Sequence, residues 1–137
     1  MPPIVSNAEL QNVANQFRDR YNIDAVLRLY KNDYTPTLAV VIGNVVECDY
    51  SGYAEVNTAG DWEAVQKDQD GKWSSMSANY IFSHSGGGVD NTVYGWYLVS
   101  GTSLLLIQRF DTPIQMENGS LPFSLQLDRE AEDQSVS

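Results

Sequence analysis

The most apolar part of the chain is a pair of segments joined by a short polar turn. Residues 92–99 and 104–110 are rich in β-branched and aromatic side chains, and the linker 100–103 is polar and contains a glycine. This pattern predicts a β-hairpin. Both arms carry apolar side chains on both faces, and antiparallel strands of this kind must be covered twice. We therefore expect the core to cover one face, and a helix, a loop or another subunit to cover the other.

One amphipathic helix is predicted near the N-terminus. Ser6 and Glu9 have the spacing of a capping box. In this motif the Ser6 hydroxyl accepts from the backbone amide of the third helical residue, and the Glu9 side chain reaches back to the backbone amide of Ser6. Apolar residues then recur at helical spacing, which indicates a helix from Asn7 to Tyr21 with one apolar stripe. We favour this helix over a neighbouring subunit as the second cover of the hairpin. The stripe consists of Leu10, Val13, Ala14, Phe17 and Tyr21.

The remaining pattern is that of short strands separated by turn residues. Strand-like segments occur at 25–30, 38–42, 45–48, 50–56, 75–83 and 121–127, and a polar long loop or weak hairpin occupies 57–72. We expect Met76, Ala78, Tyr80 and Phe82 to form one face of the strand at 75–83, and residues 111–113 to end the second hairpin arm. One helix followed by seven or eight short strands predicts a mainly β fold, a single-domain antiparallel β-sandwich with jelly-roll-like character. This domain spans 1–137, with an N-terminal arm at 1–5 and an acidic flexible tail at 129–137.

The charge balance narrows the classes of partner. The chain has 137 residues, 18 acidic against 8 basic residues and a formal net charge of −10. Such a chain repels phosphate backbones and anionic lipid surfaces, so we expect neither direct nucleic-acid binding nor a membrane partner. The sequence has no long apolar run and no signal-peptide pattern, which favours synthesis and use in the cytosol. Cys48 is the only cysteine and is expected to be a small buried hydrophobe.

No motif of a catalytic or metal site is complete in the sequence. His84 is the only histidine and no nucleophile motif accompanies it, so we interpret it as a loop residue. Residues 68–71 resemble the start of a calcium loop, but the later acidic ligands are missing and a turn is favoured. A zinc site lacks sufficient histidine and cysteine ligands. We accordingly expect no catalytic residue, no metal and no cofactor.

Five further segments have a recognisable pattern, at 34–37, 50–54, 92–97, 105–110 and 121–127. Together they resemble small structural proteins of tailed bacteriophages. In those proteins an N-terminal helix precedes LKLY…N.YTP, GYA and VYGYYV segments and a last alternating strand. This chain departs from that pattern at two places. Ile107, Gln108 and Arg109 stand where those proteins have an aromatic-acidic pair, and residues 38–47 are unusually apolar. The resemblance implies a virion component made in the host cytoplasm, a capsid decoration (cement) protein on the capsid exterior.

We therefore expect a non-enzymatic protein that binds the major capsid protein as a homo-oligomer, with a trimer favoured. If the helix covers the hairpin, the apolar run 38–46 and the termini are left for contacts between subunits. The candidate interface residues are Pro2, Pro3, Ile4, Leu38, Val40, Ile42 and Val45. The alternative is a tail- or fibre-associated module that binds carbohydrate or a host surface through its aromatic residues, although such residues are more often core. A small hydrolase or isomerase is disfavoured because the sequence has no convergent acid–base set.

Overall fold

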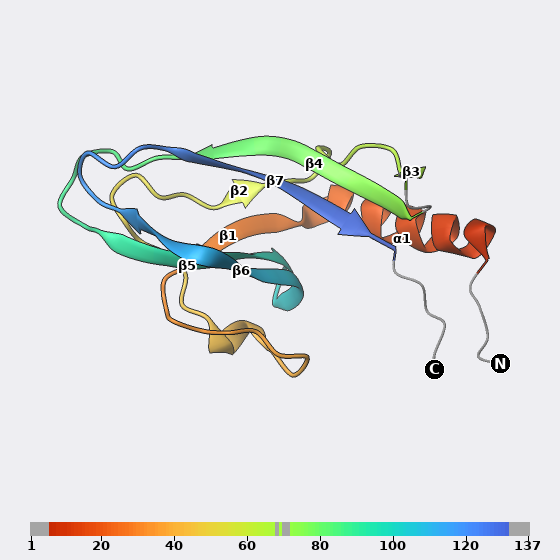
Figure 1. The fold of residues 1–137 in the computed structure, drawn as a ribbon, viewed down its shortest axis with the longest axis horizontal. Helices are drawn as coiled ribbons and strands as arrows, with labels where there is room; N and C mark the ends of the chain where they lie inside the picture. The colour runs from red at the N-terminus through yellow and green to blue at the C-terminus, as the bar shows by residue number, and fades with distance from the viewer. Residues whose placement is uncertain (1–5, 68, 70–71, 132–137) are drawn as a thin grey trace. The chain divides into compact units, whose positions relative to one another are not determined.

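The structure is a computed structural model that describes residues 6–67, 69 and 72–131 (Figure 1). It contains helix α1 (Asn7–Asp24) and the short 3₁₀ helix η1 (Ile42–Asn44). Among the described residues two antiparallel sheets form, with strand orders β2-β1-β5-β6 and β3-β4-β7. This confirms the predicted mainly β class with one N-terminal helix, and two antiparallel sheets are what a β-sandwich requires. The strands are β1 (Val26–Tyr30), β2 (Val56–Asn57), β3 (Gln66–Lys67), β4 (Trp73–Phe82), β5 (Asn91–Ser100), β6 (Ser103–Met116) and β7 (Phe123–Glu130).

The chain divides into two compact units built from interleaved segments. The first unit comprises Met1–Ile23, Thr58–Asn79 and Gln126–Ser137, and the second comprises Asp24–Asn57 and Tyr80–Leu125. Strands β4 and β7 run from one unit into the other. The single domain expected from the length of the chain stays a prediction.

In the second unit, strands β5 and β6 form the predicted hairpin. Ser100 pairs with Ser103, which leaves a two-residue loop. Gly101 has a φ of 59°, and Thr102 is not among the residues with a positive φ, which fits a type II′ turn that needs glycine at its first central position. This turn matches the right-handed twist of the two strands, so the local sequence is sufficient to set the hairpin.

Strand β6 continues beyond the position where we expected it to end. Pairing with β5 resumes at Val93 and Ile114 after an irregularity that separates this pair from Gly95 and Arg109. Pro113 therefore lies in the irregular stretch, where its missing amide proton removes no hydrogen bond of the ladder. The predicted break at 111–113 is wrong, because the chain accommodates these residues as a bulge within one strand.

A loop, rather than a strand, covers the face of β5 that carries Tyr97 and Val99. These residues form a core cluster with Tyr30 and Val45, against which Ile42 also packs. The strands expected at 38–42 and 45–48 do not form; a turn, the helix η1 and an isolated bridge at Glu47 occupy this stretch instead. The apolar pattern marked burial correctly but does not distinguish a packed loop from a buried strand.

In the first unit, helix α1 begins at the predicted residue and extends beyond the predicted end. The Glu9 amide donates to Ser6 Oγ at 3.2 Å, as the capping box requires. The helix continues past Tyr21 to Asp24. The Asn22 side chain donates to the Trp62 carbonyl at 3.2 Å and accepts from the Trp62 amide at 2.9 Å. This paired contact with the backbone of Trp62 helps to hold the last turn.

The apolar stripe of α1 packs on residues of its own unit. Leu10 and Ala14 form a cluster with Ala131, and Val65 and Trp73 pack against it. The prediction that this stripe covers the hairpin is therefore wrong, because the stripe packs on Val65, Trp73 and Ala131 instead. Strand β7 reaches Glu130 and Ala131 is 1% exposed, so residues 129–131 belong to the folded unit rather than to the predicted tail. Residues 132–137 lie outside the described part of the chain.

Strand β4 presents its small polar side chains inward. Ser75 and Ser77 are buried, whereas Met76 is 37% exposed and Ala78 is exposed. Ser75 Oγ donates to the Glu63 carbonyl at 2.7 Å, and Ser77 Oγ accepts from the Leu127 amide at 2.9 Å. The predicted apolar face is therefore wrong at Met76 and Ala78, because backbone groups distant in sequence supply partners for the serines.

Candidate interaction surface

The 34–46 loop, which covers the hairpin, also exposes apolar side chains. Leu38 is fully exposed, and Val41 and Val46 are 59% and 50% exposed. In contrast, Ile42 packs on the core cluster and Val45 is buried within it. One side of the loop thus completes the core of the second unit, and the other presents apolar residues to solvent. In Figure 1 the loop projects beyond the strand β1 from which it leaves.

Two asparagine side chains fix the backbone of the loop. Asn32 donates to the Asn44 carbonyl at 2.9 Å and accepts from the Val46 amide at 2.8 Å. Asn44 accepts from the Val41 amide at 2.9 Å through its side chain, which begins helix η1. The Lys31 amide adds a bond to the Val46 carbonyl at 2.8 Å. Because these bonds replace a strand ladder, the loop has a defined shape without regular pairing.

The entry to the loop is fixed to strand β6. Asp33 forms an ion pair with Arg109 at 2.6 Å, and Arg109 also donates to the Tyr34 carbonyl at 3.1 Å. The same carbonyl accepts from the Tyr30 hydroxyl at 3.2 Å. The Arg109 guanidinium lies 5.2 Å from the centre of the Tyr94 ring. One arginine therefore ties the loop to the hairpin by charge, hydrogen bonding and ring contact.

The stem after the loop is fixed by buried polar groups and an ion pair. The Tyr53 hydroxyl donates to Glu47 at 2.7 Å. The pKa of Tyr53 is raised, mainly by burial and in second place by this hydrogen bond. Lys31 pairs with Asp49 at 2.9 Å, and the hydrogen bonds from Lys31 and Asn91 lower the pKa of Asp49. At neutral pH, Tyr53 consequently remains a proton donor and Asp49 remains an acceptor. Burial raises the pKa of the Cys48 thiol to about 12, so this buried thiol is uncharged at neutral pH.

The structure places the predicted interface residues in different environments. Leu38 is on the exposed side of the loop, and Val40 and Ile42 are half-buried. Val45 is 9% exposed and serves the core of its own chain. Pro2, Pro3 and Ile4 lie outside the described residues. The sequence did not single out Val41 and Val46, although both belong to the same apolar run.

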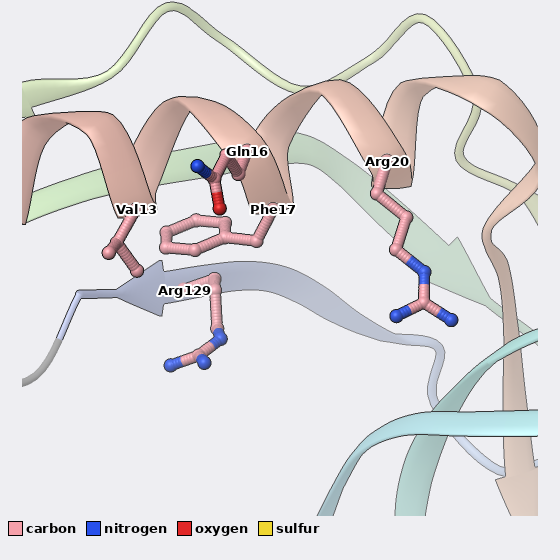
Figure 2. Close-up of a pocket in the computed structure, with 5 residues that line it drawn as sticks. All are labelled: Val13, Gln16, Phe17, Arg20 and Arg129. Atoms are coloured by element: carbon pink, nitrogen blue, oxygen red, sulfur yellow. The ribbon is translucent and has the colours of Figure 1, made fainter.

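A pocket of about 270 Å³ lies between helix α1 and strand β7 in the first unit. Arg20 and Arg129 line it together with Val13, Gln16 and Phe17 (Figure 2). The Arg129 guanidinium lies 4.9 Å from the centre of the Phe17 ring. Sequence reasoning missed this pocket, because Arg20 and Arg129 are 109 positions apart and no local pattern connects them.

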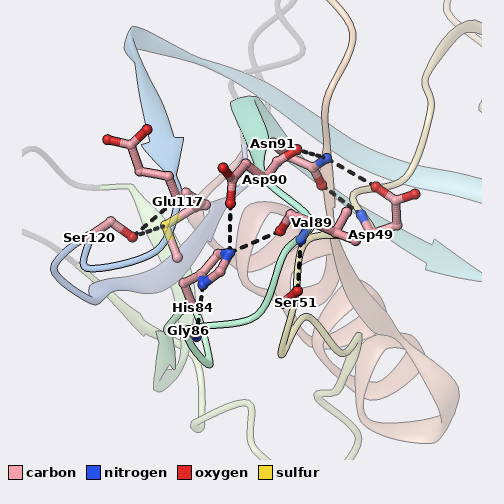
Figure 3. A network of polar contacts seen from close by, with 10 residues as sticks. Asp49, Ser51, His84, Gly86, Val89, Asp90, Asn91, Glu117 and Ser120 are labelled. Carbon is pink, nitrogen blue, oxygen red and sulfur yellow. Dashed lines mark hydrogen bonds and ion pairs between the residues drawn. The ribbon is translucent and has the colours of Figure 1, made fainter.

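His84 belongs to a polar network of the second unit (Figure 3). Its side chain is 0% exposed and stacks on Tyr50 with the ring centres 5.9 Å apart. The Gly86 amide donates to Nδ1 at 2.9 Å, so Nε2 carries the proton that faces the Val89 carbonyl at 2.9 Å and Asp90 at 3.1 Å. The predicted loop histidine therefore organises a glycine-rich turn through both ring nitrogens.

The tryptophans that could have formed a sugar-stacking platform lie mainly in the interior. Trp62 and Trp96 are 2% and 8% exposed, and Trp73 is half-buried against the helix cluster. Across residues 6–67, 69 and 72–131, no three histidine, cysteine or acidic side chains converge as a metal site would require. Residues 68, 70 and 71 of the calcium-like stretch lie outside that range. Within the described chain, no helix is long and apolar enough to cross a membrane.

No protein family model, curated protein or solved structure matches this chain.

Proposed function

We propose that the chain is a non-enzymatic structural protein of a tailed-bacteriophage virion, a decoration (cement) protein on the capsid exterior. It binds the major capsid protein as a homo-oligomer, and a trimer is the favoured assembly. The fixed 34–46 loop with its exposed apolar side is the observation that carries this proposal. The resemblance of the strand segments to phage structural proteins supports the same assignment.

The loop has the properties of a preformed protein contact. Leu38 and Val41 are exposed within four residues of one another, and Val46 returns to the same loop. Exposed apolar residues that are gathered together mark interaction sites more often than singly scattered ones do. Because Asn32 and Asn44 already fix the backbone, little conformational entropy remains to be lost when a partner binds. A rigid apolar contact suits a protein that joins subunits without performing chemistry.

The alternative of a carbohydrate- or host-binding module receives less support. Its strongest sequence argument was an aromatic platform, and two of the three tryptophans are at most 8% exposed. The buried rings pack among themselves: Tyr21 and Trp62, for example, have ring centres 5.0 Å apart. Aromatic side chains used in this way are not available to stack on a sugar.

Binding to capsids tests the proposal. Purified shells of the phage that encodes the chain, stripped of minor proteins, are incubated with the full-length protein and sedimented. We expect stoichiometric, saturable binding of the wild-type protein, and light scattering should report an oligomer, with the mass of a trimer. Combined Leu38→Asp and Val41→Asp substitutions should reduce binding by about tenfold or more, because charged groups cannot enter an apolar contact.

A matched control uses another exposed leucine of the same unit. Leu121 is 84% exposed and lies outside the 34–46 loop, so Leu121→Asp should leave binding within about twofold of the wild type. Failure of the wild-type protein to bind shells would refute the cement assignment. Equal binding by the double variant and the wild type would refute the role of the loop.

A further inference from the structure

The pocket between α1 and β7 contains two arginines that lack a carboxylate partner among the described residues. The chain has five arginines, and Arg18, Arg28 and Arg109 each form an ion pair with an acidic side chain. Neither Arg20 nor Arg129 is in such a pair within residues 6–67, 69 and 72–131. The chain as a whole is acidic, with 18 acidic residues and 8 basic ones, whereas these two arginines give the pocket a local positive charge. It points to an acidic group from outside the described structure.

Arg129 is positioned to bind rather than to move freely in solvent. Its guanidinium lies over the Phe17 ring at 4.9 Å, and one terminal nitrogen donates to the Glu130 carbonyl at 2.5 Å. Its Nε atom is buried and has no hydrogen-bond partner among the residues that the structure describes. A buried N–H group without an acceptor is costly, because it has lost its hydrogen bonds to water. An oxygen that accepts from this group would therefore form a hydrogen bond without any further desolvation of the N–H.

Arg20 supplies the second cationic group from the helix. Figure 2 shows both guanidinium groups on the side of α1 from which the Phe17 ring also extends. Guanidinium groups present planar pairs of donors that match the two oxygens of a carboxylate. Val13 and Phe17 add an apolar wall, and Gln16 adds an amide at the rim. The lining thus combines charge for an oxyanion with apolar surface for the group that carries it.

We propose that this pocket binds a carboxylate attached to an apolar group. A carboxylate suits the site better than a phosphate monoester, because a dianion is repelled more strongly by the net charge of −10 on the whole chain. The volume of about 270 Å³ accommodates one aromatic or branched aliphatic acid. Such a group is either a free organic acid or the C-terminal residue of a polypeptide, and both present the same chemistry.

Nuclear magnetic resonance on the full-length chain tests this site. The probes are N-acetylphenylalanine, its uncharged amide, phenyl phosphate and a tetrapeptide that ends in phenylalanine with a free carboxylate. We expect saturable binding of N-acetylphenylalanine in the millimolar range or tighter, with a shift of the Arg129 Nε–H signal, and at least about tenfold weaker binding of the amide. Tighter binding of the tetrapeptide assigns the site to a polypeptide terminus, and equal or weaker binding assigns it to a free acid.

Substitutions separate the pocket from general charge attraction. Arg20→Gln and Arg129→Gln should each weaken binding by about tenfold, whereas Lys67→Gln, which removes one exposed charge from strand β3, should change it by less than about twofold. Arg129→Lys keeps the charge but loses the planar donor pair, so it should remain impaired. Arg20 is exposed on the helix, and its substitution therefore tests the site even if Arg129→Gln lowers stability.

Three results would overturn the proposal. The first is equal shifts with N-acetylphenylalanine and its amide, which would remove the role of the carboxylate. The second is tighter binding of phenyl phosphate than of the carboxylate, which would assign the site to phosphoryl groups. The third is unchanged binding of N-acetylphenylalanine by both Arg20→Gln and Arg129→Gln, which would remove the role of the two arginines. None of these results depends on whether the protein binds a capsid.

Discussion

Replacement of Gly95 by alanine tests how closely strand β5, Tyr30 and the 34–46 loop fit together. A Cβ at Gly95 would lie 2.3 Å from the Gln108 carbonyl oxygen and 2.6 Å from both the Cε1 and hydroxyl oxygen of Tyr30. Tyr30 is 0% exposed and its hydroxyl donates to the Tyr34 carbonyl, so the ring has little freedom to move away. The added methyl group must therefore displace a backbone strand, the ring, or both.

The magnitude follows from two costs. Overpacking by one methyl group destabilises a core by about 1–3 kcal/mol. Moving the Tyr30 ring would also break its bond to Tyr34, which contributes about 1 kcal/mol. We expect Gly95→Ala to lower the free energy of unfolding by about 2–4 kcal/mol, a large fraction of the roughly 5–15 kcal/mol typical of a domain.

Urea unfolding, followed by circular dichroism, measures this change. With a slope of about 2 kcal/mol per molar urea, the midpoint should fall by about 1–2 M. Gly43→Ala is the matched control, because a Cβ there has no atom within 4 Å and the backbone φ is ordinary. A midpoint for Gly95→Ala within about 0.3 M of the wild type, or an equal fall for Gly43→Ala, would refute the packing argument.

Two further predictions concern the loop and the core beneath it. Asn32→Ala should destabilise the protein by about 1–2 kcal/mol and accelerate hydrogen exchange at the Val46 amide, which loses its acceptor, and unchanged exchange would contradict the role of Asn32. Cys48 should resist iodoacetamide at pH 8 until urea unfolds the chain, because its pKa is raised to about 12 in the folded state. Since this raised pKa favours the folded state only while the thiol is protonated, stability should decline as pH rises from about 9 to about 12, and Cys48→Ala should remove part of that decline. Rapid alkylation of the native protein at pH 8 would disprove this assignment.

Local signals in the sequence predicted the elements that depend on neighbouring residues. Ser6 and Glu9 identified the start of α1, and the glycine in 100–103 set the turn of the β5–β6 hairpin. In both cases the required hydrogen bonds or backbone angles involve residues within a few positions of one another. Such elements can be recognised without knowing the rest of the fold.

The errors arose where distant groups decide the environment. Ser75 is buried because its hydroxyl reaches the Glu63 carbonyl, and this contact is not visible in the alternation of β4. Similarly, the side chain of Asn32 binds the backbone of Asn44 and Val46, where the apolar pattern predicted strands at 38–42 and 45–48. A long-range polar contact supplies the partner that the local pattern cannot show, so it can reverse a face or turn a strand into a loop.

The packed 34–46 loop, which stands where strands were predicted, also determines where a partner can bind. The hairpin needed a second apolar cover, and Ile42 and Val45 provide it from within the chain. A short loop cannot turn all of its consecutive apolar residues toward one cluster, so filling the core with Ile42 and Val45 leaves Leu38 and Val41 facing solvent. If the proposed assembly forms, its contact therefore lies on the outer side of the cover and not on the hairpin itself. Substitutions at Leu38 and Val41 should then weaken assembly without unfolding the unit, whereas truncation of Val45 should reduce stability first.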